Sequence, residues 1–469
     1  MGGYFMEATK EVSQRDVRKK IYSMILPITI ESVLQMAAGF VSAIFIGRLD
    51  AVAISALGIS NRITNIIWAL FKGISTGGSV FVAQSYGAQD HKKIRHVIMQ
   101  TLLSCLIFVA ILAVILFLNG DYFLKLIYKN SSEVLRANAF EYIKVVCFGL
   151  PFLVIMLVVA SALQGMGNAK TPMKIAFIVN GTNILISPLL IFGKLGLPAL
   201  GLRGAALGLV IAQFTGAMVG LFVLFNKNGV LATYKNKEAF KLDGKQIKEI
   251  YRVGMPTAFE SIFWQVSAII LTALILNYGE VAMASYQQGL QAESISYMPA
   301  VGFAVAATAF AGQTIGANNR KLGKRYMKEI LIGSTILTSV SSIILLFFSQ
   351  QVMMLLTDKQ PIIELGSKYL ILMGLVQIPQ NLAACFNGAL RGAGFTKVPM
   401  YCAGIGLWIV RIPLALYFTY VLKLSIIAIW AAMCVDLVVR FFISIGFYKY
   451  KNIFKEEAVE KEEKADLVF

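Results

Sequence analysis

Long apolar runs, separated by short polar connections, make up most of the chain. Stretches such as 106–118 and 207–225 contain no Asp, Glu, Lys or Arg. A helix needs roughly 20 mainly apolar residues to cross a bilayer, and twelve segments reach that length. The predicted spans are 21–46, 53–84, 95–118, 139–163, 172–193, 204–226, 251–277, 281–312, 326–349, 367–390, 399–421 and 424–448.

Basic residues are concentrated in every second connection between these spans, for example at 92–95, 241–248 and 320–328. Because Lys and Arg are retained on the cytoplasmic side, this alternation predicts a multi-pass protein of the cytoplasmic (inner) membrane with both termini inside. The net charge of +18 then reflects topology and contact with anionic lipid headgroups. The lipid bilayer is therefore a predicted partner, and nucleic acid is not.

Composition agrees with a membrane protein and argues against an enzyme. Hydrophobic residues make up 57% of the chain and charged residues 14%, against about 25% charged in soluble domains. The five cysteines form no C-x-x-C pair, and His91 and His96 are the two histidines, so no metal site is expected. No phosphate-binding loop and no nucleophile–base pair is present in any span. No enzymatic activity and no cofactor are predicted.

The sequence repeats itself at a spacing of about 229 residues. The first pair of matching motifs is Pro27-x-x-x-Glu31-Ser32 and Pro256-x-x-x-Glu260-Ser261. A repeat of six helices is even, so both copies begin inside and are related by an axis along the membrane normal, as in transporters that rock two halves around a substrate. The predicted division is a cytoplasmic N-terminus 1–20, an N-lobe 21–226, a cytoplasmic linker 227–250, a C-lobe 251–449 and a cytoplasmic tail 450–469.

Two further motif pairs follow in the same order, and together the motifs resemble those of the multidrug and toxic compound extrusion (MATE) family. The matching residues are Gly73-x-Ser75-Thr76-Gly77, Ala83-Gln84-x-x-Gly87-Ala88, Gly254-Met255-Pro256, Glu293-x-x-x-Tyr297-Met298-Pro299, Gly312-Gln313-x-x-Gly316-Ala317, Leu163-Gln164-Gly165 with Leu390-Arg391-Gly392, and Arg411-Ile412-Pro413.

The resemblance implies an all-α membrane fold, with twelve transmembrane helices in two pseudo-symmetric six-helix lobes. It also implies a secondary active efflux transporter that works by alternating access. Members of the family export small organic cations and drugs by antiport with Na⁺ or H⁺, so one of these is the expected coupling ion. A monomer is expected.

Among the carboxylates inside predicted spans, three glutamates are candidates for the transport site. A charged side chain at mid-bilayer is costly and usually faces the interior. Glu31 and Glu260 each follow a proline by one turn, and the proline leaves a backbone carbonyl without its helical donor. Both are predicted to face a central cavity and to bind the coupling ion, the substrate cation or both. The alternative is that they pair with a neighbouring helix. Glu293 either joins Glu260 or forms a structural ion pair.

The resemblance fails at the acids that many relatives carry in the N-lobe. Two positions that hold aspartate there are Ser42 and Ser187 here, whereas Asn183 matches. These three side chains offer neutral oxygen ligands to Na⁺, but a serine does not carry a proton at neutral pH. The role of a coupling acid then passes to Glu31 by elimination.

Other polar and aromatic residues in the spans complete the candidate site. Lys72 lies too deep to reach the headgroups and either pairs with Glu31 or meets an anionic group of the substrate. Trp264 and Tyr286 are candidate cavity aromatics, because an aromatic face attracts a lipophilic cation. The alternative for both rings is ordinary packing.

A second group of charges, in the last two spans, favours a structural role. Asp436 and Arg440 are four residues apart on one helix face, and Arg411 lies in the preceding span. These three residues are predicted to form a buried ion-pair network that holds helices together.

Other functions are weaker alternatives. A flippase for lipid-linked oligosaccharides, or for another amphipathic lipid, would share the two-lobe architecture but would favour a basic cavity. Lys72 fits that reading and the three glutamates do not. A channel is also conceivable, although a two-lobe repeat favours rocking over a fixed pore.

Overall fold

The computed structural model describes residues 13–455, except 48, 50, 129–131, 228 and 233–240. Parts of the predicted N-terminus 1–20, linker 227–250 and tail 450–469 therefore lie outside the described residues. The described chain consists of helices and their connections, with no strand. The helices are α1 (Gln14–Gly47), α2 (Ala51–Gly87), α3 (His91–Ile127), α4 (Glu133–Gly165), α5 (Lys170–Phe192), α6 (Gly201–Phe225), α7 (Gly244–Leu276), α8 (Glu280–Gly316), α9 (Arg320–Phe347), α10 (Ser349–Met354), α11 (Gln360–Gly392), α12 (Lys397–Gly404), η2 (Ile405–Arg411), α13 (Ile412–Leu416), η3 (Tyr417–Val421) and α14 (Ile426–Lys451).

The predicted number of spans is confirmed. In the described part of the chain, twelve helices are long and apolar enough to cross a membrane, with Lys397–Val421 counted as one. Several helices extend beyond their predicted limits. For example, α3 continues to Ile127 because its last turns are polar but still helical, with Asp121 and Lys125 paired at 2.6 Å one turn apart.

Two π-helical stretches interrupt the eleventh span, at Ile405–Arg411 and Tyr417–Val421. The apolar pattern does not predict them, because a π turn changes the backbone hydrogen bonding and leaves composition unaltered. Such turns often lie at functional sites. The first of them ends at Arg411, one of the predicted network residues.

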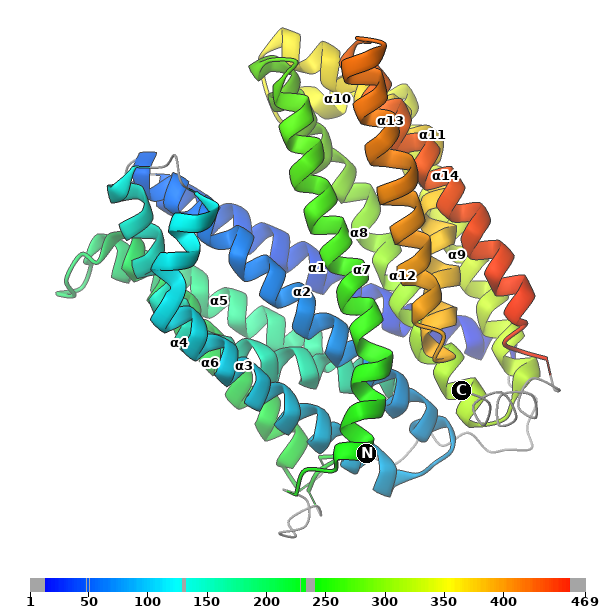
Figure 1. The fold of residues 1–469 in the computed structure, drawn as a ribbon. Helices are drawn as coiled ribbons and strands as arrows, with labels where there is room; N and C mark the ends of the chain where they lie inside the picture. Colours follow the sequence, from blue (N-terminus) through cyan, green and yellow to red (C-terminus); the bar gives the residue numbers. More distant parts are fainter. Residues whose placement is uncertain are drawn as a thin grey trace.

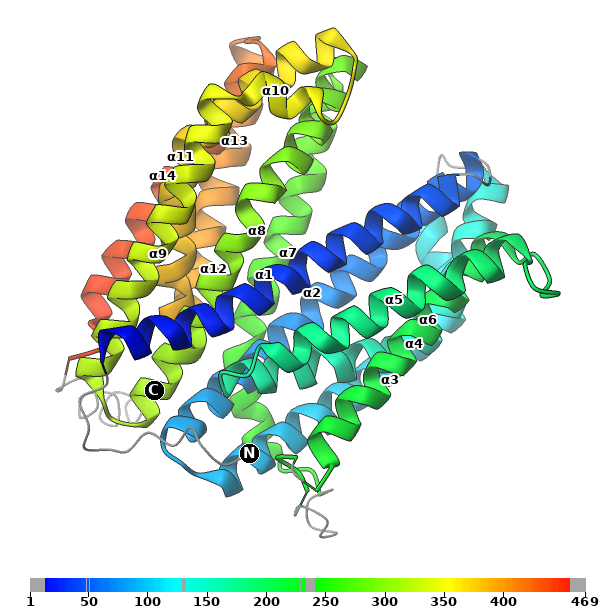
Figure 2. The ribbon, with the colours of Figure 1, turned by 180° about the vertical axis from the view of Figure 1, so that it is seen from behind.

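The helices form two lobes that diverge at one end of the molecule and meet at the other (Figures 1 and 2). One lobe contains α2 to α6, and the other contains α8 to α14. The described chain starts with α1 and finishes with α14 at the end where the lobes meet. We call this end the joined end.

The helices α1 and α7 cross from one lobe to the other (Figures 1 and 2). The first turns of α1, including Ile21 and Ile28, lie in the hydrophobic core of the C-lobe. Conversely, Ile250 near the start of α7 lies in the core of the N-lobe. The lobe boundaries at 21 and 251 in the sequence thus differ from the packing. The first turns of α1 belong to the core of the C-lobe, and the first turns of α7 belong to the core of the N-lobe.

The chain that enters α7 is anchored on α3. Asp243 caps α7 by accepting hydrogen bonds from the backbone N–H groups of Lys245 (3.0 Å) and Gln246 (3.2 Å), and its other oxygen lies 3.0 Å from Nε2 of His96. The hydrogen bond from His96, with that from Gln246, holds the pKa of Asp243 below its usual value. A lowered pKa means that this cap stabilises the fold above the ordinary carboxyl pKa, and that the stabilisation is lost as the pH falls through the lowered one.

Candidate transport site

Two glutamines at equivalent places in the repeat connect the lobes at the joined end. Gln84 on α2 donates from Nε2 to the carbonyl oxygen of Gly392 at the end of α11, at 3.1 Å. Gln313 on α8 donates in the same way to the carbonyl oxygen of Gly165 at the end of α4, at 2.8 Å. The predicted site does not include these glutamines. Their recurrence at the spacing of the repeat is the signal that could have revealed them.

Two glycines in the same motifs allow α2 and α8 to touch through their backbones. A Cβ at Gly87 would overlap the carbonyl oxygen of Gln313, and one at Gly316 would overlap that of Gln84. Small residues permit such close approach between membrane helices. The motif Gln-x-x-Gly therefore has a geometric explanation. The glutamine side chain binds the opposite lobe, and the glycine leaves room for the backbone carbonyl of the glutamine on the facing helix.

A third contact at the joined end links the start of α1 to α9. Glu329 accepts hydrogen bonds from Nε of Arg18 and from Nε2 of Gln14, each at 2.7 Å. Glu329 is buried, whereas Arg18 is exposed. Since α1 continues into the N-lobe, this ion pair also connects the two lobes.

Glu31 lies on α1 just after the part of the helix that packs in the C-lobe. Its Oε1 is 3.5 Å from Nε2 of Gln35, and its Oε2 is buried without a hydrogen-bond partner in the described structure. Lys72, half-buried on α2, acts on the Glu31 carboxylate through its charge without forming a direct ion pair. Glu31 is thus a half-buried residue that has a compensating charge nearby and one buried carboxylate oxygen left without a hydrogen bond.

The three predicted neutral ligands of the N-lobe lie together. The Ser187 hydroxyl donates to Oδ1 of Asn183 at 2.6 Å, and Nδ2 of Asn183 lies 3.4 Å from the Ser42 hydroxyl. Ser42 is on α1 and the other two are on α5, so the cluster joins the crossing helix to the N-lobe. Hydroxyl and amide oxygens are ligand types that suit a hard cation such as Na⁺. No carboxylate takes part in these hydrogen bonds.

Glu260 has a partner that the sequence does not indicate. Nη2 of Arg391 on α11 lies 2.7 Å and 3.0 Å from the two oxygens of Glu260. The exposed fractions of the two side chains are 18% for Arg391 and 12% for Glu260. The geometry therefore corresponds to the alternative reading of Glu260, in which the carboxylate pairs with a neighbouring helix.

Exchanging both partners would separate a structural from a transport role of this pair. We expect Arg391→Gln alone to lower the thermal unfolding temperature and transport, because it leaves the Glu260 carboxylate unpaired. Adding Glu260→Gln should restore both, since two neutral amides need no counter-charge. Unfolding in detergent and substrate uptake are the two measurements. Restored stability without restored uptake would show that the charged pair itself takes part in transport.

Glu293 is fully enclosed in the C-lobe. It accepts a hydrogen bond from the hydroxyl of Tyr369 at 2.6 Å and one from Nε2 of Gln377 at 3.4 Å. Tyr286 is also buried, and its ring packs edge-on against that of Tyr369 at 5.7 Å between centroids. Tyr286 thus lies in the core, as its packing alternative expects, and Glu293 is held by hydrogen bonds rather than by a direct ion pair.

Asp436 lies between two arginines in the C-lobe. Nη2 of Arg411 and Nη2 of Arg440 each lie 2.8 Å from the same carboxylate oxygen, and the Asp436 side chain is 0% exposed. The guanidinium of Arg440 lies over the Trp264 ring, 4.2 Å from its centroid, and that of Arg411 lies 5.2 Å away. The cations over the Trp264 ring in this structure are thus the protein's own side chains. Gly406 makes room for the network, because a Cβ there would overlap Asp436.

The charges inside the membrane thus largely compensate one another. Arg391 is paired with Glu260, and Arg411 and Arg440 share Asp436. Among the described residues there is no group of three His, Cys, Asp or Glu side chains that could hold a metal ion. Among Glu31, Glu260 and Glu293, Glu31 is the one with a buried oxygen left without a hydrogen bond; Asp436 also has such an oxygen, but its other oxygen is paired with two arginines.

Comparison with known proteins places these features in a family. The pattern of the family described as MatE matches residues 27–189 and 256–417, one match in each half. A Thermotoga maritima protein named "Probable multidrug resistance protein NorM" is 29% identical over 440 residues, which cover 92% of each chain. A Bacillus subtilis protein named "Probable multidrug resistance protein YoeA" is 25% identical, covering 94% of this chain and 96% of the relative.

Solved structures share the fold. An outward-facing MATE family transporter of the MOP superfamily superposes with a TM-score of 0.86 at 19% identity, covering 96% of this chain and 100% of the other. A MOP superfamily transporter from Pyrococcus furiosus, described as having a binding pocket of reversed polarity, gives a TM-score of 0.85 at 19% identity, with 93% and 96% covered. The predicted fold of twelve helices in two lobes is confirmed.

Proposed function

Because this chain belongs to the MatE family of membrane transporters, we propose that it exports small organic cations by antiport with Na⁺ or H⁺. The names of the similar proteins, which refer to multidrug resistance, support this substrate class. The matching acids in many relatives are serines here, so the coupling ion has to be argued from this chain's own residues.

Glu31 carries the proposal. It lies on a helix that belongs to both lobes, and it has a buried oxygen with no hydrogen bond. A buried carboxylate gains free energy from a bound cation, because burial otherwise leaves its charge without solvent. A substrate cation or a coupling ion supplies that charge. Lys72 interacts with Glu31 only through its charge. It therefore stabilises the Glu31 carboxylate when no cation is bound, without occupying the place of the cation.

Competition for one carboxylate provides the coupling. A single negative charge pairs with one cation at a time. Binding of H⁺ or Na⁺ therefore releases the substrate, and binding of the substrate releases the ion. The neutral cluster of Ser42, Asn183 and Ser187 supports Na⁺ as an alternative, since its oxygens are hard ligands and none of them titrates near neutral pH. Coupling to H⁺ would thus depend on Glu31, whereas coupling to Na⁺ would depend on the neutral cluster.

Alternating access follows from the arrangement of the lobes. The basic connections predict that the joined end faces the cytoplasm, so the structure corresponds to a state that is closed inside and has its lobes apart outside (Figure 1). Export then requires the contacts of Gln84 and Gln313 to break and re-form in each cycle. We expect α1 and α7 to transmit this motion, because each packs in both lobes.

A flippase for an anionic lipid is less well supported. It would need basic side chains that are free to bind phosphate. Arg391 is paired with Glu260, Arg411 and Arg440 share Asp436, and Lys72 interacts with Glu31. The described buried arginines of the C-lobe are therefore engaged within the protein.

Uptake of an organic cation such as ethidium into inverted vesicles tests the proposal. One preparation receives a Na⁺ gradient and another a pH gradient. We expect Glu31→Gln to reduce uptake at least about tenfold, which corresponds to a loss of about 1.4 kcal/mol. Glu280→Gln is the matched control, because Glu280 is exposed at the start of α8.

The two gradients separate the residue sets. If H⁺ is the coupling ion, Glu31→Gln removes the pH-driven uptake and Asn183→Ala leaves it. If Na⁺ binds in the N-lobe cluster, Asn183→Ala removes the Na⁺-driven uptake. Wild-type uptake that responds to neither gradient would rule out the antiport proposed here.

A further inference from the structure

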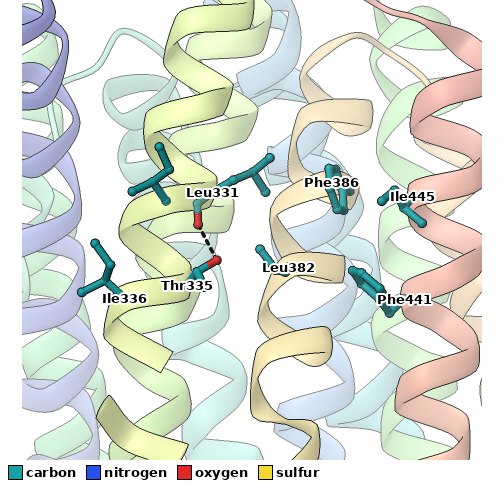
Figure 3. Close-up of a pocket in the computed structure, with 8 residues that line it drawn as sticks. Leu331, Thr335, Ile336, Leu382, Phe386, Phe441 and Ile445 are labelled. Carbon is teal, nitrogen blue, oxygen red and sulfur yellow. Dashed lines mark hydrogen bonds between the residues drawn. The ribbon is translucent and has the colours of Figure 1, made fainter. Parts of the chain in front are cut away.

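An apolar groove lies on the flank of the C-lobe, where α9, α11 and α14 meet (Figure 3). Its volume is about 350 Å³. The groove is separate from the residues considered above. It is lined by Leu331, Ile332, Thr335, Ile336, Leu382, Phe386, Phe441 and Ile445.

The groove offers no free polar group. Its one hydroxyl, that of Thr335, donates to the carbonyl oxygen of Leu331 at 2.8 Å (Figure 3). The Phe386 ring packs against that of Phe441, with centroids 6.5 Å apart. Ile336 is 61% exposed although it belongs to a membrane-spanning helix. Such a surface in a spanning segment faces hydrocarbon, so a lipid acyl chain is the chemistry that fits it.

Two lysines mark the end of the groove that lies toward the joined end. Lys328 precedes Ile332 by four residues on α9, and Lys449 follows Ile445 by four residues on α14. Because α9 begins and α14 finishes at the joined end (Figure 1), both lysines lie about 6 Å beyond the groove on the same helix faces. Each lysine thus continues one of the two outer helices of the groove toward the joined end.

Both lysines are available to a ligand. Each is exposed, and neither forms an ion pair with a described residue. The acid next to Lys328, Glu329, is bound by Arg18. Two exposed positive charges thus lie one helical turn from the apolar groove, on its side toward the joined end.

We propose that this groove binds an anionic phospholipid of the leaflet at the joined end. One acyl chain would occupy the groove, and the phosphate would lie between Lys328 and Lys449. Basic residues between membrane helices on the cytoplasmic side recognise lipid headgroups in this way. The bound lipid would bridge α9 and α14 and so stabilise the C-lobe.

Native mass spectrometry and thermal unfolding of the full-length protein in detergent test this proposal. The probes are phosphatidylglycerol and phosphatidylcholine with identical acyl chains, and glycerol phosphate without chains. We expect phosphatidylglycerol alone to remain bound and to raise the unfolding temperature. The double variant Lys328→Ala with Lys449→Ala should weaken its binding about tenfold or more.

The control is Lys92→Ala with Lys93→Ala, which removes two exposed charges from the first turn of α3. It should bind phosphatidylglycerol like the wild type. A groove-filling variant, Thr335→Phe, should weaken binding while leaving both lysines in place. Equal binding of the two phospholipids, equal loss in the control, or binding of glycerol phosphate as tight as that of the lipid would each overturn the proposal.

Discussion

Alanine at both Gly87 and Gly316 is expected to abolish transport by preventing the lobes from meeting. At each position the new Cβ would overlap a backbone carbonyl oxygen of the facing helix. A backbone atom cannot rotate away as a flexible side chain does, so α2 and α8 must separate. Overpacking of this kind costs about 1–3 kcal/mol per site, which shifts a conformational equilibrium about 5- to 150-fold. The state whose joined end is closed should be the one that is destabilised.

The control for this experiment lies on the same helix. Gly58 on α2 has open space where a Cβ would be, so Gly58→Ala should transport normally. We expect each single variant to be partly active and the double variant inactive, measured as cation uptake at equal protein levels. An active double variant would show that close contact of α2 and α8 is not needed for transport.

Removal of the Asp436 carboxylate should give the largest loss of stability. In Asp436→Asn, the guanidinium groups of Arg411 and Arg440 remain buried without their shared counter-charge. Breaking a buried ion pair by removing one partner costs about 3–5 kcal/mol. We expect a clear drop in the unfolding temperature in detergent.

An exposed ion pair provides the control for Asp436. Arg203 lies 3.0 Å from Glu141, and the two side chains are 61% and 37% exposed. Such pairs contribute about 0–1 kcal/mol, so Glu141→Gln should unfold nearly like the wild type. If Asp436→Asn were equally harmless but failed to transport, the network would have a functional rather than a structural role.

The fold could largely be predicted because the bilayer imposes simple rules. Every spanning segment must satisfy its backbone hydrogen bonds internally and remain apolar over its length. The long apolar runs therefore reveal the spans, and the repeat reveals two lobes. The crossing of α1 and α7 escapes this reasoning. Hydrophobicity says that a helix is buried in lipid or protein, but not which lobe its first turns contact.

The candidate site could be predicted in its residue types more than in its contacts. The pairing of Glu260 with Arg391 joins residues far apart in the sequence, and no local spacing encodes it. By contrast, Asp436 and Arg440 are one turn apart, so helical geometry alone brings them together. Ser42, Asn183 and Ser187 meet because α1 packs against α5. For that cluster the signal came from family resemblance, not from spacing.

We propose that the joined end opens during transport. Spin labels at Lys92→Cys and Lys321→Cys would report this opening, since both positions are exposed, one in each lobe, in the equivalent first turns of α3 and α9. The native cysteines are buried or half-buried, which limits background labelling. In vesicles that exchange an organic cation for the coupling ion, we expect a second population with a longer distance between the labels. A single, unchanged distance in a preparation that transports would contradict it.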